Sequence, residues 1–241
     1  MALTPTNVIN GTLSVVLVII SLFVGLRILT KYIESKERIF ILVGVTWIFV
    51  VSPWFPSSIA FLYYLITQAE LTDALYVFLG LFFIPIGVFI WIVAVSYLLN
   101  IKKKDLFWGL YLILGAAFEI FLVFSIFSDN LSLVMTERAG IFDVSYSLIV
   151  IIYLLINILT VFITGILFAR ESLYSKNNEV RLKGKFLLLA FTIYLIGALL
   201  DGTLQLTAGS LIITRILLMT SALLFYLGFF FPKFVKNLFI S

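Results

Sequence analysis

Cysteine and histidine are both absent from this chain, and charged residues make up only 12% of it. Their absence excludes disulfides, thiolate nucleophiles, zinc sites built on Cys or His, haem ligation by either residue, and imidazole acid–base chemistry. Most hydrolase mechanisms are excluded for the same reason. An enzyme is therefore the least favoured class of protein, and no cofactor and no metal site is predicted.

Hydrophobic residues account for 63% of the chain, and its mean hydropathy is +1.23. A soluble globular domain has roughly one charged residue in four, which is about twice the fraction found here. A chain of 241 residues has room for about seven apolar spans of roughly 20 residues and short connections. The composition predicts an all-α membrane protein that forms one domain over residues 1–241.

Seven apolar runs are each long enough to cross a bilayer as a helix. They cover residues 8–29, 39–66, 74–99, 106–127, 146–169, 186–206 and 211–231. The residues before the first run contain no basic segment, and that run is too long for the core of a signal peptide. We therefore expect a bundle of seven transmembrane helices in which the first helix is retained.

Basic residues are distributed very unevenly over the connections between these runs. Fourteen of the sixteen fall in or beside the first, third and fifth connections and the C-terminal tail: Arg27, Lys31, Lys36, Arg38, Lys102, Lys103, Lys104, Arg170, Lys176, Arg181, Lys183, Lys185, Lys233 and Lys236. The other connections contain only Arg138, and Arg215 lies within the last run. Because cytoplasmic loops carry an excess of Lys and Arg, we expect an external N-terminus and a cytoplasmic C-terminus in a cell-membrane protein.

The basic connections have two interpretations. They orient the protein and attract the anionic lipids of the cytoplasmic face, which is worth about 1 kcal/mol per residue near the surface. Alternatively, the longest inner loop, residues 170–185, docks a cytoplasmic protein partner. No nucleic-acid partner is predicted. Two glycosylation tripeptides, at Asn10 and Asn130, fall on the predicted outer face, and the sequence leaves open whether either is modified.

Ionisable residues within membrane spans are rare and are functional candidates by default. Counting from the basic residue at the inner end of each helix places Glu119, Asp201 and Arg215 roughly 22 to 27 Å from the inner boundary, at 1.5 Å per residue. Asn157 falls in the same layer. These four residues are the candidate ligand-binding residues, and they predict an outward-facing pocket in the outer half of the bundle.

Asp201 and Arg215 lie seven residues before and seven residues after Ala208, near the centre of the last tight turn. Equal distances from the turn place them at one height on adjacent antiparallel helices, so they are expected to pair. The pair is either purely structural, with each charge neutralising the other, or it also meets a ligand or ion. Glu119 has three open interpretations: a neutral buried acid, a hydrogen-bond partner of Asn157, or a carboxylate in a wet cavity.

Prolines interrupt two of the predicted helices, because each proline removes a backbone donor and clashes with the preceding turn. Pro53 lies in the second run and Pro85 in the third. Both are expected to kink the outer half of their helix. Such kinks either open an aromatic-lined pocket toward the outside or are packing irregularities of the kind that membrane helices tolerate.

The third run contains FLGLFFIP at residues 78–85, followed by Trp91, and the fifth connection contains RLKGKF at residues 181–186. The first pattern resembles the Gly, apolar run, Pro pattern in the seven-helix sensor region of prokaryotic histidine kinases, and the second is also similar. The resemblance covers about half of the chain. It implies a topology and a sensing role but no functional residues, and since no kinase domain is present, signalling would need a separate partner.

Three functional hypotheses follow from these features. The leading one is a receptor-like or sensor-like membrane protein that binds a small ligand in an outward-facing pocket and signals through a separate partner. The second is a small-solute or ion transporter that uses the membrane-embedded carboxylates of Glu119 and Asp201. The third is an accessory subunit of a membrane complex.

The predicted orientation can be tested with single cysteines, because the chain contains no cysteine of its own. Cysteines placed at Lys103 and Lys183 should react only with reagents that reach the cytoplasm, whereas those at Asp73 and Glu137 should react with an impermeant reagent added outside. External labelling at Lys183 in intact cells would reverse the orientation.

Overall fold

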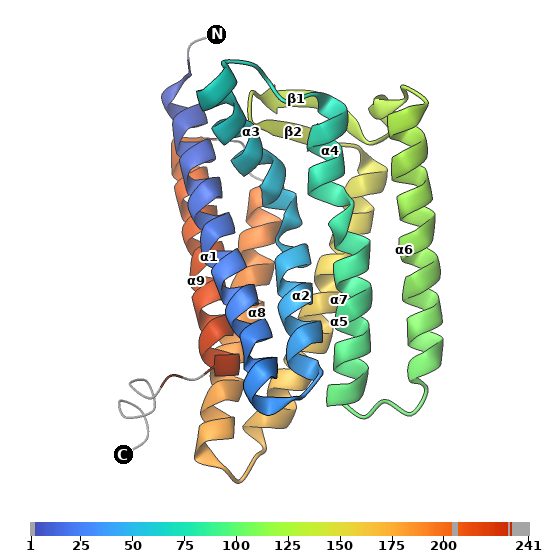
Figure 1. Ribbon diagram of the computed structural model, residues 1–241, viewed down its shortest axis with the longest axis vertical. Coiled ribbons are helices and arrows are strands. Elements are labelled where there is room, and N and C mark those ends of the chain that lie inside the picture. The colour runs from blue at the N-terminus through green and yellow to red at the C-terminus, as the bar shows by residue number, and fades with distance from the viewer. Residues whose placement is uncertain (1–2, 204–206, 231, 233–241) are drawn as a thin grey trace.

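The computed structural model describes residues 3–203, 207–230 and 232, and its helices lie side by side in an elongated bundle (Figure 1). Seven helical segments are long and apolar enough to cross a membrane: Pro5–Ser35, Ile39–Thr67, Asp73–Leu98, Lys104–Phe127, Leu148–Leu173, Asn178–Gly202 and Ala208–Phe230. They correspond one to one with the seven predicted runs. The chain is therefore a multi-pass, all-α membrane protein.

Two of these segments are divided, so the described helices number nine. They are α1 (Pro5–Ser35), α2 (Ile39–Val50), α3 (Phe55–Thr67), α4 (Asp73–Leu81), α5 (Phe83–Leu98), α6 (Lys104–Phe127), α7 (Leu148–Leu173), α8 (Asn178–Thr203) and α9 (Ala208–Phe230). Two short 3₁₀ turns, η1 (Ser52–Trp54) and η2 (Leu131–Leu133), and a hairpin of β1 (Met135–Gly140) and β2 (Asp143–Tyr146) complete the structure.

The two divided segments contain the prolines. In the second segment α2 ends at Val50, η1 contains Pro53, and α3 begins with Pro56 in its first turn. In the third segment the helix is interrupted at Phe82, three residues before Pro85. A proline cannot donate to the carbonyl four residues earlier, which accounts for a break one turn before Pro85. Both interruptions lie in the half of the bundle that carries the β-hairpin (Figure 1).

Close helix contacts hold the rest of the bundle together. A Cβ added at Gly44 of α2 would lie 2.9 Å from the carbonyl oxygen of Gly25 in α1, so these two helices touch backbone to backbone. In the core, the ring of Trp47 stacks on Phe225 of α9 at 4.1 Å between centroids. Helix α6 stands at one edge of the bundle (Figure 1) and packs mainly against α5. Large apolar side chains on its outer face are exposed, as expected where lipid replaces water.

The β-hairpin lies in the connection before the fifth span, where the hydropathy pattern predicts no strands. β1 and β2 pair antiparallel, with Arg138 opposite Val144. Arg138 fixes the hairpin to α4: its Nε lies 2.5 Å from an oxygen of Asp73, and its Nη2 donates to the Leu71 carbonyl. Since Tyr146 belongs to β2, helix α7 starts at Leu148, two residues later than predicted.

The predicted inner loop over residues 170–185 is mostly helical, so the connection between the two helices is shorter than the sequence predicts. Helix α7 continues to Leu173 and α8 begins at Asn178, so only residues 174–177 connect them. The Oδ1 atom of Asn177 caps α8 by accepting from the Glu179 amide. The charged residues on either side of this connection are therefore the ends of two long helices. The connection itself projects beyond the rest of the bundle (Figure 1).

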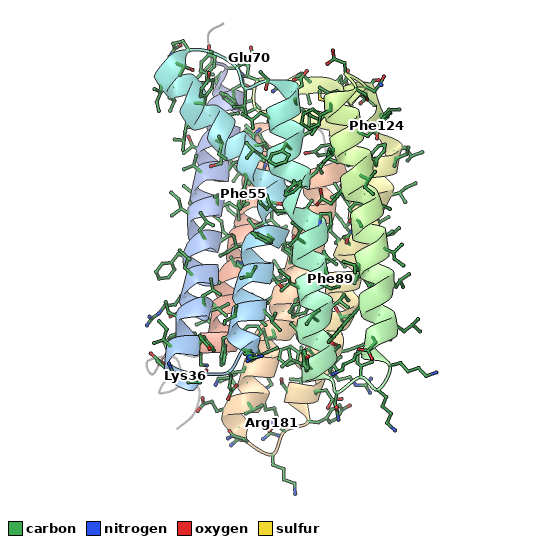
Figure 2. The ribbon with its side chains drawn as sticks, turned by 45° about the vertical axis from the view of Figure 1, so that its right-hand side comes forward. Lys36, Phe55, Glu70, Phe89, Phe124 and Arg181 are labelled. Atoms are coloured by element: carbon green, nitrogen blue, oxygen red, sulfur yellow. The ribbon has the colours of Figure 1, made fainter. Side chains whose placement is uncertain are left out.

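Charge separates the two ends of the bundle. Figure 2 shows Lys36 and Arg181 at one end, whereas Glu70 lies at the other end with the hairpin. The tail residues Lys233 and Lys236, which also contributed to the predicted orientation, lie outside the described residues. The hairpin end thus carries few of the chain's basic side chains.

Candidate functional site

A cavity of about 550 Å³ lies in the hairpin half of the bundle. Helices α7 and α8 form one side of it, and the interrupted segments α2–η1–α3 and α4–α5 form the other. Residues of β2 also line the cavity, and α9 contributes Arg215. The cavity lies where the proline-interrupted helices cannot pack as straight rods, so its position follows from the two breaks.

The predicted pair of Asp201 and Arg215 is formed, which confirms the inference from their spacing about the turn. Oδ1 of Asp201 accepts hydrogen bonds from Nη1 of Arg215 and from the Thr214 hydroxyl, the latter at 2.8 Å. Oδ2 accepts from the indole N–H of Trp54 at 2.8 Å. Both carboxylate oxygens are therefore satisfied, and the ion pair joins η1, α8 and α9 beside the cavity.

Arg215 is only 3% exposed, and its second partner is Asn10 of α1. Nη2 of Arg215 donates to Oδ1 of Asn10 at 3.2 Å, and the Asn10 amide donates in turn to the Phe142 carbonyl at 3.4 Å. Sequence reasoning treated Asn10 as a glycosylation candidate, and its burial within α1 excludes that role. Asn130 is exposed, so its modification stays an open prediction.

Phe142 anchors the tip of the hairpin over the site. Its side chain is 1% exposed and contacts the rings of Phe61 and Tyr64 edge to face. Its carbonyl accepts a second hydrogen bond, from the Tyr76 hydroxyl at 2.9 Å. The tip is therefore bound to α1, α3 and α4 at once, and this contact holds the first residues of β2 against the cavity.

Asp143, the first residue of β2, also lines the cavity. One of its oxygens accepts the Val144 amide at 2.9 Å. Burial raises the pKa of the Asp143 carboxyl to about 6; Asp201 adds to the rise, while the Val144 amide and Arg215 oppose it. Sequence reasoning missed Asp143 because it lies between the spans, where an acid is usually solvated. Only the folding of the hairpin brings it to the ion pair.

The remaining wall is aromatic and aliphatic. Trp54, Tyr76, Tyr146 and Tyr194 come from four different elements, and α5 and α7 supply Ile, Leu and Val side chains. The rings of Trp54 and Tyr194 meet edge to face at 6.3 Å. A cavity that is largely apolar and carries a few convergent charged groups at one end has the composition of a small-molecule site.

The cavity opens on the side of the molecule where α7, α8 and β1 meet. Four of its lining residues are exposed to the surroundings of the bundle: Ala139, Ile151, Leu155 and Gly202. Among the described residues, a Cβ added at Gly202 would meet no atom within 4 Å. A ligand could therefore reach the charged end past apolar residues near the end of the bundle.

Asn157 lines the cavity, in agreement with the depth predicted for it. Its side-chain amide donates a hydrogen bond within α7, to the Tyr153 carbonyl at 2.7 Å. Two threonines of the same helix make contacts between helices. Thr164 accepts from the Trp91 indole at 2.7 Å, and Thr160 shares a hydrogen bond with Tyr111 at 2.6 Å. The threonines thus fix α5 and α6 to α7.

Glu119 does not line the cavity, which corrects the prediction that it shares a pocket with Asn157, Asp201 and Arg215. Its neighbour Phe118 faces α7 and stacks on Tyr153 at 3.7 Å. Since successive helical residues are rotated by about 100°, Glu119 points to another side of α6. Depth along a helix can be counted from sequence, whereas its rotation cannot. Both Glu119 oxygens are buried without a hydrogen-bond partner among the described residues.

Comparison of the chain with protein-family models, curated proteins and solved structures finds no match. Among residues 3–203, 207–230 and 232, no three acidic side chains come together in a way that could hold a metal ion. The chemistry of the site is therefore inferred from its own residues: one arginine, two carboxylates and four aromatic side chains around an apolar space.

The ion pair should behave as a coupled unit in a double-mutant cycle. Asp201→Asn strands the guanidinium of Arg215, and we expect a loss on the order of 3 kcal/mol in the free energy of unfolding. Arg215→Gln should cost less, because Asp201 is more exposed and keeps the Trp54 and Thr214 donors. The double variant should recover much of the loss. Thermal and denaturant unfolding of the four proteins in one detergent measures the coupling.

Asp73 and Arg138 provide the matched control pair. Their side chains are 45% and 22% exposed, against 17% and 4% for Asp201 and Arg215. An exposed pair contributes about 0.2 to 1 kcal/mol, so the coupling between Asp73→Asn and Arg138→Gln should be much smaller. Equal coupling in the two cycles, or simple addition of the Asp201 and Arg215 losses, would contradict the structural role of the buried pair.

Glu119→Gln should leave stability almost unchanged. The carboxyl group makes no hydrogen bond among the described residues, so an amide of similar shape removes no interaction, and we expect a change within about 0.5 kcal/mol. The comparison with Asp201→Asn, the same kind of acid-to-amide change, serves as the control. A loss comparable to that of Asp201→Asn would show that Glu119 has a charged partner in the membrane.

Proposed function

We propose that this protein is a receptor-like or sensor-like component of the cell membrane, which binds a small molecule in the cavity and signals through a separate partner. The observation that carries the proposal is the cavity itself: about 550 Å³ in volume, mostly apolar, with the Asp201–Arg215 pair and Asp143 at one end. A purely structural ion pair does not require open space beside it. Here it lines a volume large enough for a drug-sized ligand.

The proposed orientation places the hairpin and the cavity outside and the ends near Lys36 and Arg181 in the cytoplasm. The separation of basic side chains between the two ends supports it (Figure 2). Glu137 on β1 is the better external reporter for the labelling experiment, because Asp73 is engaged with Arg138. In this orientation a ligand arrives from outside or from the outer leaflet.

The cytoplasmic end has two proposed partners. Anionic lipids would neutralise the basic residues around the inner helix ends. A protein partner would contact the projecting tip of α7 and α8, where the connection of residues 174–177 is short and both flanking helices are continuous. A rigid helical tip can transmit a shift of α8, whose other end carries Asp201, over the length of the membrane.

The transporter hypothesis receives less support from the same geometry. It required Glu119 and Asp201 to act together, yet Glu119 lies away from the cavity and Asp201 already accepts three hydrogen bonds. The accessory-subunit hypothesis has no specific contact in its favour. The receptor-like proposal uses the cavity, the hairpin and the ion pair together.

The test is a ligand screen with a cavity-filling variant. We expect some members of a chemically diverse set of small amphiphiles to raise the unfolding temperature of the protein in lipid nanodiscs, because a ligand that binds only the folded state stabilises it. Gly202→Phe should abolish the effect by occupying the cavity. Gly109→Phe is the matched control: among the described residues a Cβ at either glycine meets no atom within 4 Å, but Gly109 lies on α6, which does not line the cavity.

Two results would contradict the proposal. One is that no compound stabilises the protein. The other is that every stabilising compound acts equally on Gly202→Phe and Gly109→Phe, which would place the binding elsewhere. Loss of folding in both glycine variants would be recognised from their unfolding curves without ligand, and smaller substitutions at Gly202, such as Leu, would then replace Phe.

A further inference from the structure

We propose that the cavity takes a small organic cation, an ammonium group on an apolar body, whose positive charge is bound by the carboxylate of Asp143. This inference rests on the proposed ligand-binding function and names the chemical class of the ligand. It follows from the charge balance of the cavity, from the position of Asp143 and from the side on which the cavity opens.

The charged groups of the cavity do not cancel. Asp143, Asp201 and Arg215 line it, so two carboxylates face one guanidinium. Arg215 is paired with Asp201, and this pair is internally neutral. With Asp143 ionised, the cavity carries one negative charge in excess, which a cationic ligand would balance.

Asp143 is the carboxylate that remains available. Among the described residues its only hydrogen bond is the one accepted from the Val144 amide, and no Lys or Arg side chain lies within salt-bridge distance of it. Asp201, by contrast, is occupied by Trp54, Thr214 and Arg215. A charged donor entering the cavity therefore finds its partner on β2 and does not have to break the buried pair.

An anionic ligand fits the same cavity less well. The guanidinium of Arg215 still has an unpartnered Nε, but this atom is buried and the side chain is 4% exposed. An anion that approached Arg215 would also meet Asp143 and Asp201. The unpartnered Nε–H of Arg215 is thus closed off from the cavity, whereas Asp143 lines it.

The aromatic wall of the cavity would contact the apolar part of the ligand. Trp54, Tyr76, Tyr146 and Tyr194 supply rings in the wall, and aromatic faces attract an ammonium group as well as an apolar body. The opening is bordered by Ile151 and Leu155, which are 47% and 39% exposed on the outer surface of α7. An amphiphilic cation that collects at a membrane surface would pass these residues and meet Asp143 at the charged end.

The experiment compares three probes with nearly the same apolar body: 4-phenylbutylammonium, 4-phenylbutan-1-ol and 4-phenylbutanoate. Binding to the full chain in phosphatidylcholine nanodiscs is measured by calorimetry, with empty nanodiscs subtracted. We expect the cation to bind at least about tenfold more tightly than the alcohol, because a charge-assisted hydrogen bond is about twice as strong as a neutral one. The anion should bind most weakly.

Two variants of Asp143 identify the carboxylate. Asp143→Asn should bring the affinities for cation and alcohol to within about twofold of each other while leaving the alcohol's affinity unchanged, and Asp143→Glu should retain most of the preference for the cation. Gly202→Phe should remove the binding of all three probes. If Asp143→Asn fails to fold, the comparison of Asp143→Glu with the unmodified chain and the pH dependence below carry the test.

The preference should also depend on pH. Since the pKa of Asp143 is raised to about 6, the carboxylate is charged above this pH, and the advantage of the cation should be present at pH 8 and lost at pH 5. The groups that face Asp143 are Tyr76 from α4, Tyr146 from β2, Asp201 from α8 and Arg215 from α9. Asp143→Asn measured at both pH values separates its titration from theirs.

The outcomes distinguish this inference from the proposed function. If the alcohol binds in the cavity and the cation has no advantage, or if 4-phenylbutanoate binds best, the cation inference is overturned and the ligand-binding function stands. If none of the three probes binds, the inference is overturned, and the wider screen decides the function. A preference for the cation that persists in Asp143→Asn would assign the charge recognition to another group and overturn the role of Asp143.

Discussion

The burial of Arg215 is the constraint on which the hairpin half of the structure depends. A guanidinium within the membrane span has no water to satisfy it, so its charge and its donors require partners inside the protein. Asp201 supplies the charge and Asn10 supplies an acceptor. Through these two residues the cation links α9 to α8 and α1, and Asp201 extends the link to Trp54 in η1.

The same hydrogen-bond network holds the β-hairpin beside the cavity. Asn10 holds Arg215 with its oxygen and the Phe142 carbonyl with its amide, so the hairpin and the buried ion pair share a side chain. A ligand that alters the charge at Asp143 acts one residue from Phe142. The proposed ligand site at Asp143, the position of the hairpin and the packing of α1, α8 and α9 are therefore physically connected, which would give the proposed sensing role a route through the fold.

The two proline-containing segments leave space in the hairpin half of the bundle, and the hydrogen-bond network places polar side chains beside that space. Straight helices at α2–α3 and α4–α5 would bring their side chains into the centre, as in the opposite half of the bundle, where Gly25 and Gly44 allow backbone contact. The interruptions at η1 and Phe82 prevent this packing near the hairpin. The cavity of about 550 Å³ lies in the half of the bundle that contains both interruptions.

The seven spans and the match in height of Asp201 and Arg215 can be predicted from the sequence, because hydropathy and the rise per residue of a helix are local properties. The sequence also indicated the helix interruptions through Pro53 and Pro85. That Glu119 does not line the cavity, and that Asn10 and Asp143 belong to the site, follows only from the tertiary structure. Helix rotation and the docking of a loop depend on contacts between residues far apart in the chain, such as Asn10 and Phe142, which no local pattern records.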